Sequence, residues 1–192
     1  MQPQLQRYVD RIRDIVARDL SCDDRAVELQ GAVQALADDP PSIGADCRCM
    51  PESGHGRNLL YKDPDTGFVV VAMIWPAGYG SCVHDHAGTW CCMAVLEGRI
   101  HVQNYERIDD QSNPDFVVLH ETTAFDAEVG AVEVVQACPH DYHTVANALD
   151  DGVTVTIHTY GTDQAPVRLI DLETHGVQIC EQTYHNELAS QS

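Results

Sequence analysis

His84 and His86 are separated by one residue in the segment Cys-Val-His-Asp-His, a spacing that could hold a metal ion. In a β-strand, residues i and i+2 point to the same side, so the two imidazoles share a face and Asp85 points the other way. Two imidazoles on one face can both reach a metal ion about 2.0–2.2 Å away. The pair alone fits two surface histidines beside a turn equally well.

A third histidine, His143, opens the segment His-Thr-Val-Ala-Asn, in which Asn147 follows four positions later. With Gly78 before the histidine pair and Gly98 after it, this order resembles the two cupin motifs, G-x5-H-x-H-x3,4-E-x6-G and P-x-G-x2-H-x3-N. The resemblance covers roughly residues 57–160 and implies a metal site made by His84, His86 and His143. The alternative is a rim histidine that merely follows the turn Cys-Pro-His-Asp-Tyr, in which the neighbouring His140 lacks the matching asparagine.

Cys91 stands where the first cupin motif has its glutamate ligand. Three neutral histidines leave a divalent metal its full positive charge, whereas a site of two histidines and one carboxylate partly neutralises it. They also leave one face open, which suits the binding of a thiolate and dioxygen together. A glutamate-containing cupin dioxygenase is therefore disfavoured.

Polar residues occupy one whole face of the predicted strand over residues 153–160. By alternation they share that face, while Val153, Val155 and Ile157 share the other. The polar set consists of Thr154, Thr156, His158 and Tyr160. Such a face is either solvated or lines a polar active site.

Further spacings make the chain similar to the thiol dioxygenases, and within them to the cysteine dioxygenase family. His158 follows His143 by fifteen positions, and Tyr160 follows two later, as in that family's Ser-x-His-x-Tyr strand. The segment Gly-Arg-Asn-Leu places Arg57 at the family's R-N-L motif, and Trp75 precedes His84 by nine positions. Cys91 matches the cysteine that mammalian members join to the active-site tyrosine as a thioether.

The resemblance implies a cofactor, a reaction and a role for each residue. Ferrous iron on the three histidines would bind a thiol, and dioxygen would convert R–SH to R–SO2H. Arg57 would grip the substrate carboxylate, with His55 and Trp75 also at the substrate and Trp75 acting mainly as a wall. Three residues would be catalytic: Tyr160 as hydrogen-bond donor, His158 as its orienting group and Thr156 as a relay. Cys91 and Tyr160 could form the thioether.

Departures from the family pattern concern the substrate more than the reaction. His55 replaces a common tyrosine, Thr156 replaces the serine, and Gly-Thr-Asp follows Tyr160 where the family has Ser-Pro-Pro. Relatives that act on 3-mercaptopropionate tend to carry glutamine at the position of Arg57, which favours L-cysteine. The alternatives are 3-mercaptopropionate, mercaptosuccinate, which would need a second cation near the iron, and a non-catalytic metal-binding cupin.

Composition limits the partners. The 192 residues carry a net charge of −19, which repels nucleic acid and anionic membranes. No run of 18 apolar residues spans a membrane, and the charged N-terminus is not a signal peptide. We expect a cytoplasmic protein that binds a small thiol and dioxygen, with no obligate protein partner. Its eight cysteines are then mostly free thiols, with Cys82, Cys92 and Cys138 as packing residues.

The elements that must position these residues follow from periodicity. Apolar spacing predicts helices over 4–19 and 24–37, the second capped by Asp23, and many short strands separated by turns follow. The predicted class is mainly β: a cupin-type, jelly-roll-like antiparallel β-barrel with an N-terminal helical cap. Residues 1–192 form one domain, with the cap over 1–40, the barrel over 57–165 and a C-terminal strand and tail over 166–192.

Overall fold

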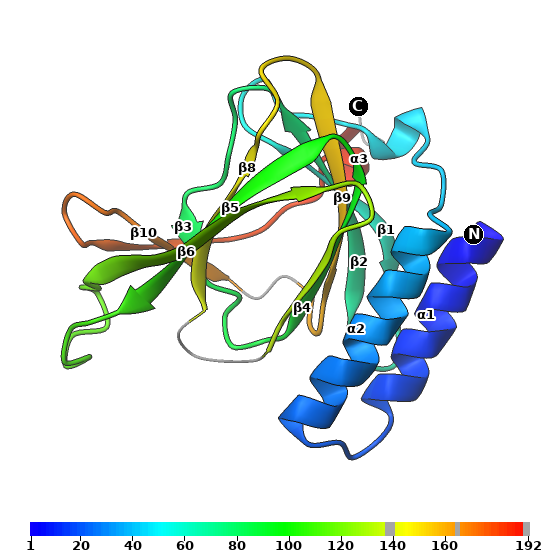
Figure 1. The fold of residues 1–192 in the computed structure, drawn as a ribbon, viewed down its shortest axis with the longest axis horizontal. Coiled ribbons are helices and arrows are strands. Elements are labelled where there is room, and N and C mark those ends of the chain that lie inside the picture. The colour runs from blue at the N-terminus through cyan, green and yellow to red at the C-terminus, as the bar shows by residue number, and fades with distance from the viewer. Residues whose placement is uncertain (137–140, 164–165, 190–192) are drawn as a thin grey trace.

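A computed structural model describes residues 1–136, 141–163 and 166–189, and it contains two antiparallel sheets and an N-terminal helical pair (Figure 1). Most neighbouring strands are distant in sequence, as in a jelly roll, and the two sheets face each other without closing. The first sheet has the order β1 (Gly56–Lys62), β2 (Val69–Pro76), β9 (Val153–Tyr160), β4 (Cys91–Glu97) and β7 (Val132–Val135). The second sheet has the order β11 (Val177–Cys180), β10 (Val167–Ile170), β3 (Val83–His84), β8 (Tyr142–Asn147), β5 (Arg99–Arg107) and β6 (Leu119–Glu128).

Helices α1 (Pro3–Val16) and α2 (Cys22–Asp38) pack against the outer face of the first sheet (Figure 1). The buried face of α1 is the one that its apolar spacing predicts: Leu5, Tyr8, Val9, Ile12 and Ile15. The start of α2 differs from the prediction, because Ser21 and not Asp23 is the N-cap. Its hydroxyl accepts a hydrogen bond from the Asp24 amide at 3.1 Å, which satisfies a free N–H of the first turn.

Strand β2 is buried on both faces, which explains its unbroken apolar run. Val70, Ala72 and Ile74 pack in the core beneath the helices. The alternating set, Val69, Val71, Met73 and Trp75, packs in the core between the sheets. A strand covered on both sides loses the polar alternation of a half-exposed one. The N-terminal helices therefore make β2 a central strand, and its inward face becomes a wall of the interior.

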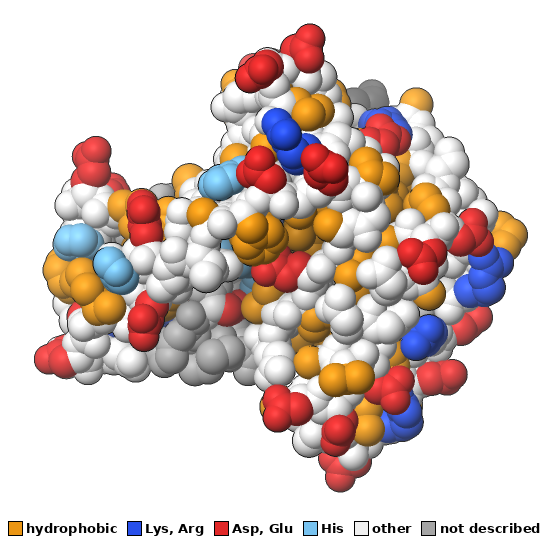
Figure 2. Space-filling model, in the orientation of Figure 1, with side chains coloured by type: hydrophobic (Ala, Val, Ile, Leu, Met, Phe, Trp, Pro, Cys, Tyr) orange, Lys and Arg blue, Asp and Glu red, His pale blue; other side chains and the backbone are white. Residues whose placement is uncertain are grey.

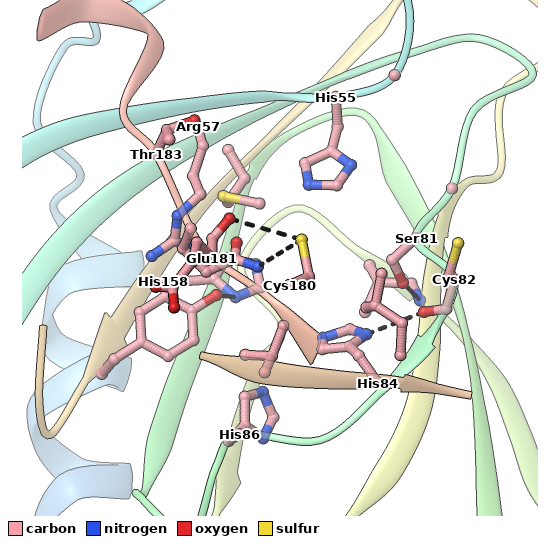
Figure 3. Close-up of a pocket in the computed structure, with 18 of the residues that line it drawn as sticks. His55, Arg57, Ser81, Cys82, His84, His86, His158, Cys180, Glu181 and Thr183 are labelled. Atoms are coloured by element: carbon pink, nitrogen blue, oxygen red, sulfur yellow. Dashed lines mark hydrogen bonds between the residues drawn. The ribbon is translucent and has the colours of Figure 1, made fainter. Parts of the chain in front are cut away.

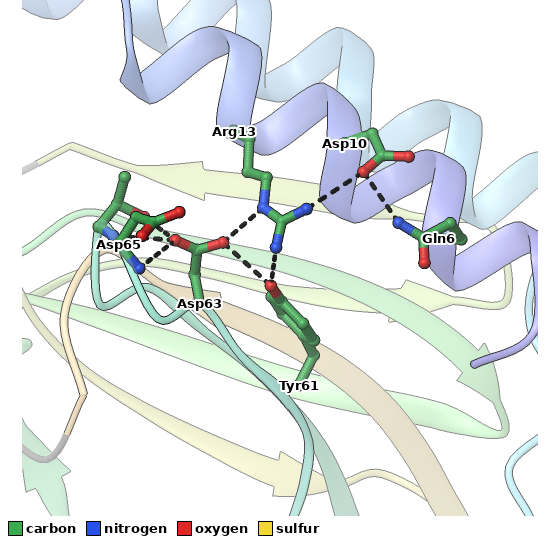
Figure 4. Close-up of polar contacts among 7 residues, drawn as sticks. Gln6, Asp10, Arg13, Tyr61, Asp63 and Asp65 are labelled. Atoms are coloured by element: carbon green, nitrogen blue, oxygen red, sulfur yellow. Dashed lines mark hydrogen bonds and ion pairs between the residues drawn. The ribbon is translucent and has the colours of Figure 1, made fainter.

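A buried carboxylate fastens α1 to the turn after β1 (Figure 4). Asp63 is about 1 % exposed and accepts hydrogen bonds from Arg13 Nε at 2.6 Å and from the Tyr61 hydroxyl at 3.0 Å. It also accepts from the Thr66 amide at 2.8 Å, and these bonds hold its pKa below the usual range despite burial. Asp10 reaches the same guanidinium from an exposed position at 3.4 Å. The Asp63 side chain thus holds both the turn after β1 and helix α1 in place.

The C-terminal segment forms more structure than the single strand expected after residue 166. Strand β10 pairs with β3 and with β11, and the short helix α3 (His185–Ala189) follows. Asn186 of α3 accepts from the Leu59 amide at 2.9 Å and donates to the Leu59 carbonyl at 3.0 Å, as a neighbouring strand would. The segment therefore runs from the second sheet to the edge of the first. No helix among the described residues has the length and apolar character to cross a membrane.

Candidate metal centre and active site

Three histidines from the second sheet come together between the two sheets. His84 on β3 is the register partner of His143 on β8, and His86 lies two residues beyond the end of β3. One ring nitrogen of each lies within 4.8 Å of those of the other two. Among the described residues this is the only group of three or more histidine, cysteine or acidic side chains with such geometry. The predicted trio is therefore assembled by one strand pair.

Hydrogen bonds at Nδ1 orient two of the rings. The Nδ1–H of His84 donates to the Cys82 carbonyl at 3.0 Å, and that of His86 donates to Asp141 Oδ2 at 2.5 Å. Such bonds fix the tautomer and leave Nε2 as the free donor atom for a metal. Asp141 was not anticipated from the sequence, although it lies only two positions before His143.

Burial keeps two of the three imidazoles neutral. It lowers the pKa of His84 to about 4, and the neighbouring His86 adds to the shift. It also lowers the pKa of His143 well below its ordinary value, with His84 and His86 contributing. A neutral imidazole is the form that binds a metal ion. The donor set therefore fits a divalent transition metal, with no carboxylate to neutralise it.

Asp85 points away from the centre, as alternation predicts. It is buried, and it pairs with Arg168 Nε of β10 at 2.7 Å. The Arg168 amide donates to the same carboxylate at 3.0 Å. The residue between two candidate ligands thus fastens β3 to the C-terminal strand.

Asn147, the last residue of the second motif, joins the sheets at the far end of β8. Its amide donates to the Trp75 carbonyl of β2 at 2.8 Å, and its oxygen accepts from the Thr154 hydroxyl at 3.0 Å. The asparagine of the motif is therefore structural, because it sets the spacing of β8 from β2 and β9.

The polar face of β9 lines the interior opposite the histidines and is not solvated. Thr156 is 0 % exposed and His158 is buried. The Trp75 indole donates to the Thr156 hydroxyl at 2.9 Å, and this hydroxyl lies 3.0 Å from His158 Nε2. His158 Nδ1 lies 3.2 Å from the Tyr160 hydroxyl. Four side chains thus form one hydrogen-bonded chain, and Trp75 is part of it rather than only a wall.

Arg57 is a buried cation with no counter-ion in the described part of the chain. Its side chain points inward from β1 and the residue is 7 % exposed. The guanidinium lies 5.0 Å from the Tyr160 ring centre and 5.3 Å from that of Tyr184. Within residues 1–136, 141–163 and 166–189 it makes no ion pair, and its Nε has no hydrogen-bond partner. The surface salt bridge that charge composition alone would favour is not found there.

His55 lies at the same wall, stacked on Trp75 with ring centres 4.5 Å apart. Burial lowers its pKa to about 4, and the charges of Arg57 and His185 push it down further. His55 is therefore a neutral, flat side chain beside the guanidinium.

One cavity of about 470 Å³ joins these groups, and Figure 3 shows His55, Arg57, His84 and His158 around it. Its lining also includes Trp75, His86 and Tyr160. The part of its rim formed by residues 180–185 was not predicted, because that segment has no recognisable sequence pattern. That segment contributes Cys180, Glu181, Gln182, Thr183 and His185. Cys82, expected to pack in the interior, is exposed at the rim, whereas Cys92 is buried as expected. Cys138 and His140 lie outside the described residues.

Tyr160 lines this cavity, and Cys91 of β4 is its register partner in the first sheet. Burial raises the pKa of the Cys91 thiol well above its ordinary value. Burial likewise raises the pKa of Tyr160, Cys91 adds to the rise, and Arg57 opposes it. Both groups are therefore protonated at neutral pH.

Comparison with known proteins identifies the family of the chain. The family described as cysteine dioxygenase type I matches residues 4–170. Cysteine dioxygenase type 1 of Rattus norvegicus is 22 % identical over 161 residues, which cover 83 % of this chain and 76 % of the relative. The Homo sapiens enzyme of the same name is 28 % identical over 87 residues, covering 45 % and 42 %.

Solved structures with a similar chain trace include two cupin domains. The Cnp3 cupin domain of Schizosaccharomyces pombe has a TM-score of 0.44 at 18 % identity, covering 58 % of this chain and 67 % of that one. A cupin-like protein of Thermotoga maritima has a TM-score of 0.47 at 18 % identity, covering 69 % and 89 %. Because the family match spans most of the sequence and includes all three clustered histidines, the chain belongs to the cysteine dioxygenase type I family of the cupin superfamily.

Proposed function

We propose that this chain is a non-haem iron(II) thiol dioxygenase that oxidises L-cysteine to its sulfinic acid. The reaction is R–SH + O2 → R–SO2H, in which both oxygen atoms reach the sulfur and no further reductant is needed. The observation that carries this proposal is the pairing of a three-imidazole cluster with a buried Arg57 at one cavity, with no counter-ion for Arg57 among the residues that the structure describes. A thiol that also bears a carboxylate matches both features.

Arg57 would recognise the substrate through its carboxylate. A guanidinium donates two parallel hydrogen bonds to a carboxylate, a geometry that lysine lacks. The wider protein field opposes an anion, because the net charge is −19 and acidic side chains are scattered over the face in Figure 2. A local buried cation is therefore the means by which a carboxylate can be held. Neutral His55 and Trp75 shape the wall beside it without adding charge.

Ferrous iron, when bound by the three neutral histidines, would supply the acidification of the substrate thiol and the electrons that activate dioxygen. The remaining work falls to the chain itself. His158 and Thr156 orient Tyr160, and the Tyr160 hydroxyl donates a hydrogen bond at the reacting end of the substrate.

The proposal is tested by oxygen uptake after anaerobic loading with iron(II), on L-cysteine, 3-mercaptopropionate, mercaptosuccinate and cysteamine. Metal analysis of the same sample gives the iron content, and 18O2 reports whether both atoms reach the product. We expect uptake to be highest with L-cysteine and to give a doubly labelled sulfinate. The His143→Ala protein is the control without a complete site.

Two outcomes would contradict the proposal. Uptake that is highest with 3-mercaptopropionate or mercaptosuccinate would overturn the substrate and keep the chemistry. A fully iron-loaded protein that consumes no oxygen with any of the four thiols would be a non-catalytic metal-binding cupin.

A further inference from the structure

We propose that Trp75 is a positioning residue that sets the direction of the hydrogen-bonded chain Trp75–Thr156–His158–Tyr160 and thereby turns the Tyr160 proton toward the cavity. The direction of these hydrogen bonds depends on which ring nitrogen of His158 carries the proton. This inference deepens the proposed function, on which the consequence for Tyr160 rests, but the protonation pattern itself follows from burial and geometry.

The hydrogen-bonded series begins at the Trp75 indole, a group that can only donate. The indole nitrogen has one N–H and no lone pair to offer, so the 2.9 Å contact runs from Trp75 to the Thr156 oxygen. The Thr156 hydroxyl hydrogen then needs an acceptor of its own, and the residue is 0 % exposed. In the described part of the chain, its one other hydrogen-bond partner is His158 Nε2 at 3.0 Å.

These two contacts of Thr156 determine which ring nitrogen of His158 is protonated. If Nε2 carried the hydrogen, two donors would meet at Thr156 and its own hydroxyl hydrogen would be buried without a partner, which is costly. If Nε2 is unprotonated, it accepts from Thr156 and the proton of the neutral ring lies on Nδ1. Cys91 agrees with this arrangement: its thiol hydrogen points to the Cys92 carbonyl, and its sulfur faces His158 Nδ1 at 3.9 Å.

The same donor-to-acceptor order continues from His158 to Tyr160. The Nδ1–H of His158 donates to the Tyr160 oxygen at 3.2 Å, and the other polar neighbour of this oxygen, Arg57, is also a donor. The phenol hydrogen is thus left to point into the cavity, where a substrate or water can accept it. If His158 were protonated on Nε2 instead, the Tyr160 hydroxyl would donate its hydrogen to His158 Nδ1. It would then offer only lone pairs to the cavity. Trp75 therefore decides whether Tyr160 is a donor at the substrate.

The test is the tautomer of His158, which long-range 1H–15N correlation spectra report directly. The full-length chain is labelled with 15N-histidine and loaded with diamagnetic zinc(II), and the His158 signals are assigned by their loss in His158→Gln. We expect the Nδ1–H form alone in the unmodified protein and in Thr156→Ser, which keeps the hydroxyl. Trp75→Phe and Thr156→Val should lose this single form and show the Nε2–H form.

Thr159→Val is the matched control, because Thr159 is equally buried on β9 but faces α1, where its hydroxyl bonds Tyr8 at 2.7 Å. It should keep the Nδ1–H form even if it unfolds more easily. In the iron enzyme, kcat of Trp75→Phe should fall about 10- to 100-fold, with little change in KM. An Nε2–H form in the unmodified protein, or an unchanged tautomer in both Trp75→Phe and Thr156→Val, would overturn the inference. Neither result depends on turnover, so a failure of the proposed oxidation is seen separately.

Discussion

Cys91 on β4 and Tyr160 on β9 are direct register partners at the cavity. Side chains directly opposite on antiparallel strands have Cβ atoms about 4.5–5.5 Å apart. The adjacent Cys92 points to the other face, into the core beneath the helices. The sheet thus brings one of two neighbouring thiols against the tyrosine ring.

We predict that turnover joins these two side chains in part of the sample. A bond would form between the Cys91 sulfur and the Tyr160 ring carbon next to the hydroxyl, with loss of two hydrogens to dioxygen. Mass spectrometry of the denatured, reduced protein should show the lighter chain and one joined peptide. Cys91→Ala should abolish that peptide and Cys92→Ala should keep it. Separate peptides alone after many turnovers would rule out the cross-link and leave the oxidation untouched.

Asp141 should control metal affinity through His86. Asp141→Asn keeps the shape but loses the charge that accepts the His86 proton at 2.5 Å. Changes to such orienting partners typically weaken metal binding 10- to 100-fold, so we expect about that loss in iron affinity. Competition with a chelator measures it. Asp126→Asn is the control, since Asp126 accepts from exposed His101 at 2.7 Å, away from the trio. An equal effect of the two changes would contradict the role of Asp141.

Arg57 should discriminate substrates by their carboxylate. Arg57→Ala is expected to cost about 2–4 kcal/mol for L-cysteine, or about 30- to 1,000-fold in kcat/KM. Cysteamine has no carboxylate and should lose far less. Steady-state oxygen uptake on both thiols gives the ratio. The backbone amide of residue 57 still donates to His185, so the local fold has a reason to persist. Equal losses on the two thiols would show that Arg57 does not contact the carboxylate.

Acid should destabilise the protein through His55. Its pKa is about 4 in the fold and 6.5 when unfolded, so between these values the unfolded chain binds more protons. The free energy of unfolding should therefore fall as pH drops from 6.5 to about 4. The shift corresponds to about 3 kcal/mol, and we expect about 2 because the ring is only partly shielded.

Denaturant titrations of His55→Gln across this pH range measure the contribution. Between pH 6.5 and 4, the free energy of unfolding of the variant should fall by about 2 kcal/mol less than that of the unmodified protein. The same change at exposed His120 is the control. Parallel curves for His55→Gln and the unmodified chain would refute the assignment.

The anchor of α1 should depend on Asp63 rather than on Asp10, although both contact Arg13 (Figure 4). Asp63→Ala leaves partly buried donors of the turn and of Tyr61 without their acceptor, which should cost about 2 kcal/mol of unfolding free energy. Asp10→Ala removes only an exposed contact and should change little. Thermal or urea unfolding of the two variants decides this. Equal effects would mean that the network does not anchor the helix.

Local pattern predicted the parts of this protein that repeat or alternate. The apolar spacing of α1 fixed its buried face, and the two-residue period placed His84 with His86 and Thr156 with His158. The link between His143 and His84 came only from the family motif, because strand pairing across distant segments leaves no local trace. For the same reason the sequence did not predict Asp141 beside His86, Tyr184 beside Arg57, or the segment from Cys180 to His185 at the cavity. The burial of Arg57 without an ion pair could be seen only in three dimensions.

The pairing of β2 with β9 has a consequence for the order of events during synthesis. β2 is made early, but the third histidine on β8 and the neighbouring strand β9 are made only after about three-quarters of the chain. Pairings of such long sequence separation form late and slowly. The nascent chain therefore holds His84 and His86 for a long time without His143. Metal binding by all three histidines would therefore have to wait until most of the chain has been synthesised.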